Sequence, residues 1–258
     1  LSIILSIIYI ISFFLSRKHA KEESNLLNTI KIEGNTTINE AKENDEKMYT
    51  NEMVVEIPKK ENERIVKVKK LKEENSDIVG WLEIKDTNIN YPVLQGKDNQ
   101  YYMTHNYKKE KSKNGSIFLT KDYDWNIPSS NLLIYGHNLN NGTMFQELLK
   151  YEKQSFYEKH PIIRFTTDKE DTEFEIISVF KSRVYYKSEK NVFRYYYFVN
   201  ARNEEEYNEF VKNAKKEALY NIEATAKYGE QLITLSTCSY HVEDGRFAVV
   251  AKKVKSNI

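Results

Sequence analysis

The spacing of hydrophobic residues changes at Trp81 and divides the chain into a helical start and a region of strands. Apolar residues recur at roughly helical spacing from Ile65 to Val79, and Gly80 interrupts the pattern, which predicts an N-terminal helix. After Trp81, short β-type runs alternate with turns rich in Asn, Asp and Gly. These runs cover 81–84, 89–94, 116–120, 132–135, 162–166, 174–186, 232–237 and 247–254. They predict a barrel or a sandwich rather than a parallel βαβ sheet, and we favour a barrel.

Two helical patterns interrupt the strands. A short apolar face runs from Met144 to Leu149, and a longer one runs from Tyr207 to Ala218. Asn203 precedes the longer face, and an acidic residue follows it three positions later, which is a typical N-terminal capping pattern. Both faces are predicted to pack against the core.

The first sixteen residues form an apolar run, Leu1–Ser16, which carries no charge and is followed by Arg17 and Lys18. As a helix the run is about 24 Å long, somewhat shorter than the ~30 Å hydrocarbon core of a bilayer. The sequence given begins without Met. We expect an N-terminal membrane anchor, with a cleaved signal peptide as the alternative. The basic residues after the run favour a cytoplasmic C-terminal side, so charge alone does not settle the orientation.

The next segment, residues 17–60, is rich in Lys, Glu, Asn and Thr and has only scattered hydrophobic residues. Such a composition buries too little apolar area to offset the entropy cost of ordering, so we interpret the segment as a polar tether. The expected organisation is therefore an anchor over 1–16, a tether over 17–60 and one folded domain over 61–258.

Composition and charge narrow the function further. Of 258 residues, 40% are apolar and 30% are charged, which argues against a wholly disordered, collagen-like or polytopic membrane protein. The net charge of +1 gives no general attraction to nucleic acid. A single cysteine excludes an intrachain disulfide and a multi-cysteine zinc site, and we expect no metal and no cofactor.

That cysteine, Cys238, ends the run QLITLSTC, which has the character of a buried strand. A thiol at the end of a rigid strand is both held in place and close to the loops, where a nucleophile can be reached. The alternative is a buried structural cysteine, which is the more common fate of a lone thiol.

Five histidines are candidates for an acid or base. His19 lies in the tether, and His160 lies in a charged connection, so both are expected to be solvated. His105 is expected at the surface or in a groove. His137 follows the strand-like run LLIY and a glycine, which places an imidazole at another strand end. His241, three residues after the cysteine, is its rival.

Arg246 opens the last predicted strand, eight positions after Cys238. If the two strands are neighbours, the guanidinium lies beside the thiol and can donate to a developing oxyanion. The alternative is a hairpin arginine paired with Glu243 or Asp244. A nucleophile, an acid/base and an anion stabiliser together indicate acyl transfer through a thioester.

These residues resemble the sortases, and class B sortases in particular. The resemblance rests on TLSTC, which ends at Cys238, on YGHN, which contains His137, on the Arg246 strand, and on the run WLEIKDTNINYPVLQGKDNQYY. It extends over roughly residues 61–254. It implies a mainly β fold with some helix: an eight-stranded barrel with N-terminal helices and a long helix, here over 203–220, before the cysteine strand.

The resemblance also implies an activity. Cys238 would attack the carbonyl of a Thr residue in the C-terminal sorting signal of a secreted protein, and a peptidoglycan amine would resolve the acyl-enzyme. The implied partners are such proteins, peptidoglycan or its lipid-linked precursor, and the membrane. The implied location is a single-pass membrane protein with an extracellular catalytic domain. His137 would be the acid/base and Arg246 the oxyanion stabiliser. The implied peptide-binding residues are Asn99, Met103, Tyr135 and Ser236.

One position departs from the family pattern. An acidic residue often stands two places after the family's cysteine, whereas this chain has Tyr240 there. A third, acidic member of the site is therefore in doubt, with Glu243 and Asp244 as weak substitutes. Two other functions stay open from the residues alone: a non-catalytic surface-binding module with a Tyr-rich surface, and a cysteine protease that only hydrolyses.

Overall fold

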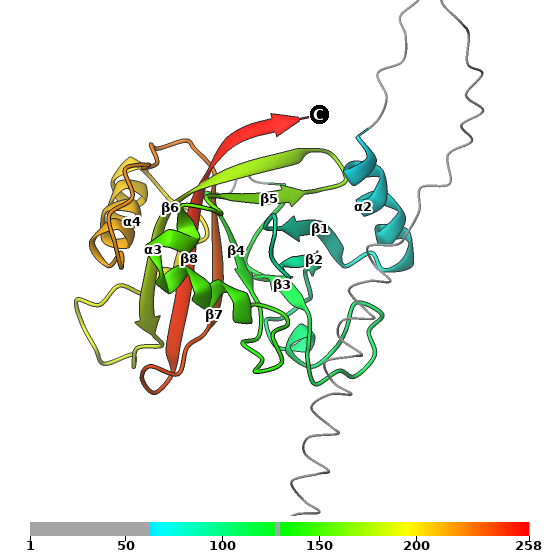
Figure 1. Cartoon of the computed structure of the whole chain (residues 1–258), viewed down its shortest axis with the longest axis horizontal. Coiled ribbons are helices and arrows are strands. Elements are labelled where there is room, and N and C mark those ends of the chain that lie inside the picture. The colour runs from blue at the N-terminus through cyan, green and yellow to red at the C-terminus, as the bar shows by residue number, and fades with distance from the viewer. Residues whose placement is uncertain (1–61, 127–129, 258) are drawn as a thin grey trace, which may run out of the picture.

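The computed structural model describes residues 62–126 and 130–257. This part of the chain contains eight strands: β1 (Ile78–Glu83), β2 (Asn90–Leu94), β3 (Ile117–Leu119), β4 (Asn131–Tyr135), β5 (Ile162–Thr166), β6 (Asp171–Arg183), β7 (Leu232–Cys238) and β8 (Gly245–Asn257). They close into one barrel in the order β1-β2-β3-β4-β7-β8-β6-β5, as Figure 1 shows. The predicted barrel is confirmed, and the sandwich alternative is wrong.

Two parallel pairings shape the barrel, because β2 pairs with β3 and β4 pairs with β7 in the same direction. All other neighbours, including the closing pair β1 and β5, are antiparallel. The carboxyl ends of β4 and β7 therefore meet at one edge of the barrel, and the start of β8 meets the end of β7 there.

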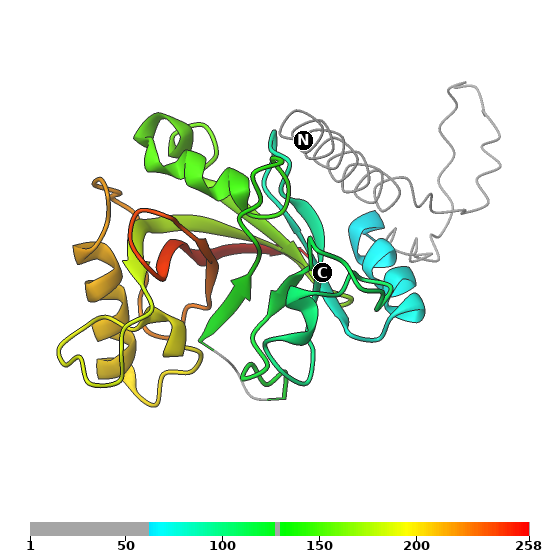
Figure 2. The same cartoon turned by 90° about the horizontal axis from the view of Figure 1, so that it is seen from below.

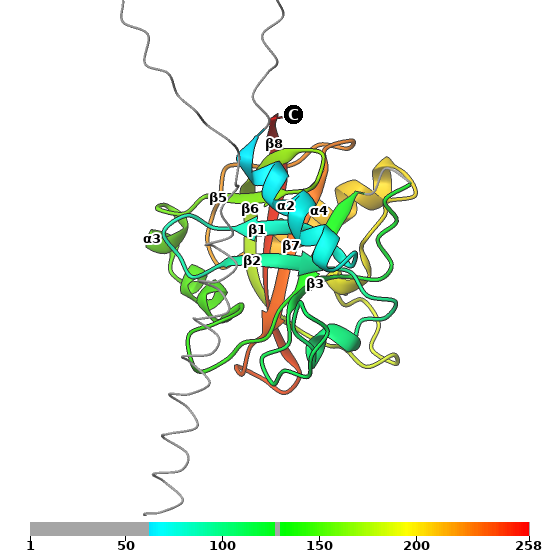
Figure 3. The same ribbon diagram turned by 90° about the vertical axis from the view of Figure 1, so that its right-hand side faces the viewer.

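The helices of the described chain lie outside the barrel. They are α2 (Glu63–Glu74), α3 (Gln154–Tyr157) and α4 (Glu204–Lys216), with short 3₁₀ helices at Tyr101–Met103, Gln146–Glu152 and Tyr195–Tyr197. Figure 2 shows α2 and α4 on opposite flanks, and Figure 3 shows α2 beside β1. The short helix that the sequence predicts from Met144 is observed as the 3₁₀ helix that begins at Gln146.

The N-terminal helix is shorter than its pattern indicates. Helix α2 buries Ile65, Val68 and Leu71, whereas the apolar pair at 78–79 belongs to β1. The position of Gly80 in the pattern indicated the end of a helix, but the structure shows otherwise. This glycine lies within β1, where a Cβ atom would come within 2.4 Å of the Phe165 ring, so the close approach of β5 requires a glycine.

Helix α4 begins where the sequence predicts and ends earlier than the expected 203–220. The side chain of Asn203 accepts a hydrogen bond from the backbone N–H of Glu206, at 2.9 Å. The Glu206 carboxylate in turn accepts from the backbone N–H of Arg202, one residue before the usual capping-box partner. The helix stops at Lys216, because the next residues pair with β6 through an Ala218–Phe180 bridge.

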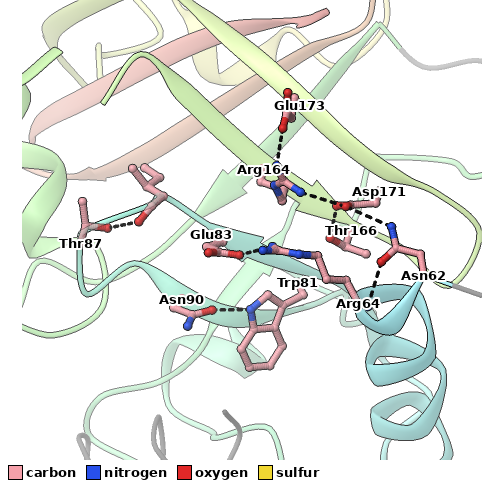
Figure 4. Close-up of polar contacts among 11 residues, drawn as sticks. Asn62, Arg64, Trp81, Glu83, Thr87, Asn90, Arg164, Thr166, Asp171 and Glu173 are labelled. Carbon is pink, nitrogen blue, oxygen red and sulfur yellow. Dashed lines mark hydrogen bonds and ion pairs between the residues drawn. The ribbon is translucent and has the colours of Figure 1, made fainter. Parts of the chain in front are cut away.

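A polar network joins the start of α2 to the barrel (Figure 4). The buried carboxylate of Asp171 accepts hydrogen bonds from the side chains of Asn62 (3.3 Å), Arg164 (3.1 Å) and Thr166 (2.7 Å). Arg164 also pairs with Glu173 on the neighbouring strand. One carboxylate therefore holds the helix, β5 and β6 together at the end of the barrel where α2 begins.

Replacing Asp171 with alanine is expected to lower the free energy of unfolding by about 2–4 kcal/mol, because the buried Thr166 hydroxyl loses its acceptor and the partly buried Arg164 guanidinium keeps only Glu173. Asp168→Ala is the matched control. It removes a more exposed pair with Lys72 (2.7 Å) and should cost less than about 1 kcal/mol. Urea denaturation of both variants measures the difference. Equal losses would contradict this role of Asp171.

The expected anchor over 1–16 and tether over 17–60 lie outside the described residues, as does His19. Among the described residues, no helix has the length and apolar character needed to span a bilayer.

Candidate active site

Three chemically different side chains meet at one edge of the barrel because of the strand register. In the parallel pair β4–β7, Tyr135 lies opposite Ser236, so the residues that follow both strands leave the barrel together. In the antiparallel pair β7–β8, Cys238 lies opposite Arg246. The imidazole of His137, two residues past Tyr135, therefore reaches the same edge as the thiol and the guanidinium.

A pocket of about 190 Å³ opens at this edge. It is lined by Asn99, Met103, Phe118, Tyr135, Gly136, His137, Ser236, Thr237, Cys238 and Arg246. All seven residues that the sequence analysis singled out for catalysis or peptide binding are among them. Three were not predicted: Gly136 and Thr237 adjoin the catalytic candidates within the two motifs, whereas Phe118 lies on β3 and has no signal in the sequence.

A larger cavity, of about 680 Å³, lies at the other end of the barrel. It includes Leu132 at the start of β4 and Gln231 just before β7, whereas the thiol is at the end of β7. Neither a cysteine nor a histidine lines it. Volume alone would favour this cavity, but the chemistry places the candidate active site in the smaller pocket.

The thiol of Cys238 is free and partly exposed, whereas the rest of β7 is buried. This contradicts the alternative of a sealed structural cysteine. The strand fixes the backbone of Cys238 through its pairing with β8, and the next residue, Ser239, donates its backbone N–H to the carbonyl of Gly245 at 2.9 Å. The sulfur is thus held by a rigid element at the mouth of a pocket, which suits a nucleophile.

His137 is oriented by a backbone carbonyl. Its Nε2 lies 2.7 Å from the carbonyl oxygen of Met103. Because a carbonyl oxygen can only accept, Nε2 must carry the proton in this contact, and Nδ1 is the nitrogen that gains or loses a proton. The same bond can form whether or not Nδ1 is protonated, so the ring keeps one orientation as acid and as base, as the histidine of a catalytic triad does.

The other described histidines lie elsewhere. His241 does not line the pocket, and its Nδ1 lies 2.9 Å from the Ser239 hydroxyl. His105 is half-buried, and its imidazole stacks on the ring of Tyr101. His160 is half-buried rather than solvated, because its Nδ1 contacts the Phe156 carbonyl at 2.9 Å.

Arg246 is held by the backbone of the turn before it. Its Nη1 donates to the carbonyl oxygens of Gly245 (2.9 Å) and Asp244 (3.3 Å). Among the described residues, its hydrogen bonds go to these backbone carbonyls and not to the carboxylates of Glu243 or Asp244, which are exposed and do not line the pocket. The alternative of a hairpin ion pair is therefore wrong, and the guanidinium belongs to the pocket.

Two phenols lie near Arg246: that of Tyr195, which is buried, and that of Tyr135, which is half-buried and lines the pocket. The Tyr195 hydroxyl and the Ser236 hydroxyl are 2.7 Å apart, and both groups are buried. Burial raises the pKa of Tyr195 and of Tyr135, so both phenols stay neutral at physiological pH and can donate hydrogen bonds. Tyr195 lies on a 3₁₀ helix far from the motifs in sequence and was not predicted.

The far wall of the pocket is formed by residues near the first 3₁₀ helix. Asn99 is fixed by two contacts: its Oδ1 accepts from the backbone N–H of Lys121 (2.7 Å), and its Nδ2 donates to the Thr120 hydroxyl (3.4 Å). Met103 is 43% exposed. An exposed, flexible thioether beside a pocket suits contact with a peptide side chain.

No group of three or more potential metal ligands occurs among the described residues. A thiol, an oriented imidazole and a guanidinium can carry out acyl transfer.

Comparison with known proteins agrees with this chemistry. A family model described as the sortase domain matches residues 82–254, which include Cys238, His137 and Arg246. Sortase B of Staphylococcus aureus (strain NCTC 8325 / PS 47) is 34% identical over 183 residues, covering 70% of this chain and 72% of that protein. Sortase B of Listeria monocytogenes serovar 1/2a is 36% identical over 184 residues, covering 70% of this chain and 71% of that protein.

Solved structures show the same similarity. A Staphylococcus aureus sortase B–substrate complex has a TM-score of 0.66 and 33% identity, with coverage of 74% of this chain and 85% of that chain. Clostridium perfringens sortase B has a TM-score of 0.66 and 32% identity, with coverage of 72% and 99%. A sortase B complexed with triglycine has a TM-score of 0.65 and 33% identity, with coverage of 74% and 86%.

Proposed function

Because this chain belongs to the sortase family, and within it to the class B sortases, we propose that it cleaves a C-terminal sorting signal after Thr and transfers the protein to a peptidoglycan amine. Sortases are cysteine transpeptidases, and so is this enzyme. The observation that carries the proposal is the pocket that brings the free thiol of Cys238 together with His137 and Arg246.

In the first half-reaction, the Cys238 thiol passes its proton to His137, its sulfur forms a bond to the carbonyl carbon of the Thr residue, and the carbonyl electrons move to oxygen. Arg246 stabilises this oxyanion by donating hydrogen bonds. As the oxyanion collapses, the carbon–nitrogen bond to the next residue breaks. His137 gives a proton to the leaving amine, which leaves the protein joined to Cys238 as a thioester.

In the second half-reaction, an amine from the cell wall attacks the thioester carbon and loses a proton to His137. The carbon–sulfur bond breaks, and Cys238 departs as a thiolate. His137 can carry out both transfers through Nδ1 while Nε2 stays bonded to the Met103 carbonyl, since that bond holds the ring in place in both protonation states.

The peptide substrate would lie along the remaining wall of the pocket. Asn99 and Ser236 offer polar groups, Tyr135 offers an aromatic surface, and Met103 offers an apolar contact at the rim. Two solved relatives support this class of substrate: one is a substrate complex, and another is complexed with triglycine. Triglycine is thus a suitable amine acceptor for an assay.

The experiment combines purified enzyme, candidate sorting-signal peptides and triglycine, and identifies the products by mass spectrometry. Transpeptidation predicts a peptide that ends in Thr joined to triglycine. A peptide that ends at a free Thr carboxyl, with no dependence on added amine, would support the protease alternative. No cleavage of any signal, together with a native thiol that resists labelling, would support the binding-module alternative.

Arg246→Met is expected to lower kcat/KM for the sorting-signal peptide by about 10²–10³-fold, because the oxyanion loses a positioned donor. Arg246→Lys should restore only part of the rate, since an ammonium lacks the planar fork of the guanidinium. Steady-state kinetics beside a thermal melt separates this effect from instability. If Arg246→Met keeps at least half of the wild-type kcat/KM, the oxyanion role is wrong.

The location follows in part from the family, in which the catalytic domain is extracellular. We extend this to a single-pass membrane protein, with residues 1–16 as the anchor and 17–60 as the tether that carries the domain at 61–258. The apolar run Leu1–Ser16 supports this proposal. Protease treatment of intact cells should remove the domain, and a fully protected domain would contradict the proposed orientation.

A further inference from the structure

Two side chains extend the pairing of β4 with β7 beyond its last backbone bond. The backbone ladder ends at Tyr135 opposite Ser236, and the backbone N–H of Gly136 then donates to the Ser236 carbonyl at 3.2 Å. Past this point, the Thr237 hydroxyl donates to the Gly136 carbonyl at 2.7 Å. One step further, the side-chain amide of Asn138 donates to the Cys238 carbonyl at 3.0 Å.

These two bonds flank the catalytic pair. The first ties the residue before His137 to the residue before Cys238, and the second ties the residue after His137 to Cys238 itself. Thr237 is 3% exposed and Asn138 is 8% exposed, so water competes little for either bond. The imidazole and the thiol are thus held in register by side chains that lie just outside the ladder.

The other side of the His137 turn is already fixed by the backbone. The backbone N–H of Phe145 donates to the His137 carbonyl at 2.9 Å, and Asn138 forms an isolated antiparallel bridge with Met144. On its cysteine side, the one contact past Gly136 within residues 62–126 and 130–257 is the hydrogen bond from the Asn138 amide to the Cys238 carbonyl. That amide is therefore the contact whose loss would let His137 move relative to Cys238.

We propose that Asn138 is a positioning residue that sets the distance between the His137 imidazole and the Cys238 thiol. It does not line the pocket, so it acts through its neighbours rather than on the substrate. The inference rests on the proposed function, since it presumes that Cys238 and His137 react together. A displacement of about 1 Å in such a pair can cost a factor of about 10² in rate.

Asn138→Asp is the informative substitution, because it keeps the shape of the side chain and replaces the donor amide with a carboxylate that repels the Cys238 carbonyl. Asn141→Asp is its matched control in the same turn. The amide oxygen of Asn141 accepts from the backbone N–H (3.2 Å) and hydroxyl (2.6 Å) of Thr143, and a carboxylate retains both contacts. The two variants thus make the same change from amide to carboxylate, and Asn138→Asp is the one that removes the donor to the Cys238 carbonyl.

The measurements are kcat and KM for sorting-signal peptide with triglycine, and the pH profile of Cys238 alkylation by iodoacetamide. Asn138→Asp should lower kcat by about 10–100-fold with KM within about twofold, and it should shift the alkylation profile. Asn141→Asp should match wild type in both. A merely structural role of Asn138 would lower the melting temperature and leave the alkylation profile of the folded enzyme unchanged.

If Asn138→Asp does not fold, Asn138→Ala supplies the same readouts without a buried charge. Wild-type kcat and a wild-type alkylation profile in the folded variant would overturn the inference while leaving the proposed function intact, provided that Cys238→Ala is inactive. Turnover by Cys238→Ala would instead overturn the proposed function itself. The two failures are therefore distinguishable.

Discussion

Replacing Cys238 with alanine is expected to lower turnover of a sorting-signal peptide by at least about 10⁴-fold, because the thioester cannot form without the sulfur. The barrel should survive, since the side chain ends β7 and is partly exposed, so its removal leaves no sealed cavity. The measurement is product formation with triglycine, with the melting temperature recorded for both proteins. Mass spectrometry of the wild-type enzyme with peptide alone should detect the acyl adduct on Cys238, and the variant should show none.

Ser239→Ala is a useful companion to that variant. It removes one side-chain atom from the residue beside the nucleophile and keeps the thiol, so it should retain most of the activity. Ser239 is buried, and its hydroxyl contacts His241. Removing this hydroxyl tests whether any substitution at the end of β7 lowers turnover. Cleavage by Cys238→Ala at more than about a hundredth of the wild-type rate would exclude covalent catalysis by this thiol.

The strands of this protein could be predicted from the sequence because each one is a short apolar run bounded by turn residues. All eight predicted runs overlap observed strands, from β1 to β8. The predictions were wrong at positions where tertiary contacts, rather than local sequence, determine the secondary structure. The apolar pair at 78–79 continues the helical spacing of α2, yet it lies in β1, which pairs with β2. Gly80 has the position of a helix stop, yet the ring of Phe165 is the reason for a glycine there.

The candidate site was predictable to the extent that its residues end strands. Cys238, His137 and Arg246 each follow or open an apolar run, and the resemblance to the sortases added the peptide-binding candidates. The partners that hold these residues could not be predicted. The acceptor for His137 is the backbone carbonyl of Met103. Every residue has a backbone carbonyl, so the sequence does not indicate which one will contact the imidazole. Tyr195 and Ser236 are far apart in the sequence, and their hydroxyl groups come into contact because the chain folds into the closed barrel.

The contact of His137 with the Met103 carbonyl explains how the site can work without an acidic residue two places after Cys238. Tyr240, at the position where the family often has a carboxylate, is 76% exposed and does not line the pocket. The carboxylates of Glu243 and Asp244 are exposed as well. The Met103 carbonyl orients His137 in their place, so the enzyme can hold its imidazole for proton transfer without a third ionisable side chain. Substituting Tyr240 should therefore change activity little.

His137→Ala is expected to lower kcat by about 10³-fold, because neither the leaving amine nor the attacking amine then has a proton partner. His241→Ala is the matched control: it removes the other imidazole close to Cys238 in sequence, and it should retain at least half of the activity, since His241 contacts Ser239 and not the pocket. Both variants keep the nucleophile, so the thiol should still react with iodoacetamide.

The two half-reactions allow a sharper test of the same assignment. A peptide ester needs little protonation of its leaving group, so His137→Ala should form the acyl-enzyme from an ester much faster than from the amide of a sorting signal. Added imidazole should then speed the release of the acyl group to triglycine, because it supplies the missing base. An inactive His241→Ala beside an active His137→Ala would reverse the assignment. Equal losses on ester and amide would show that His137 only shapes the pocket, since a proton donor must matter more where the leaving group is more basic.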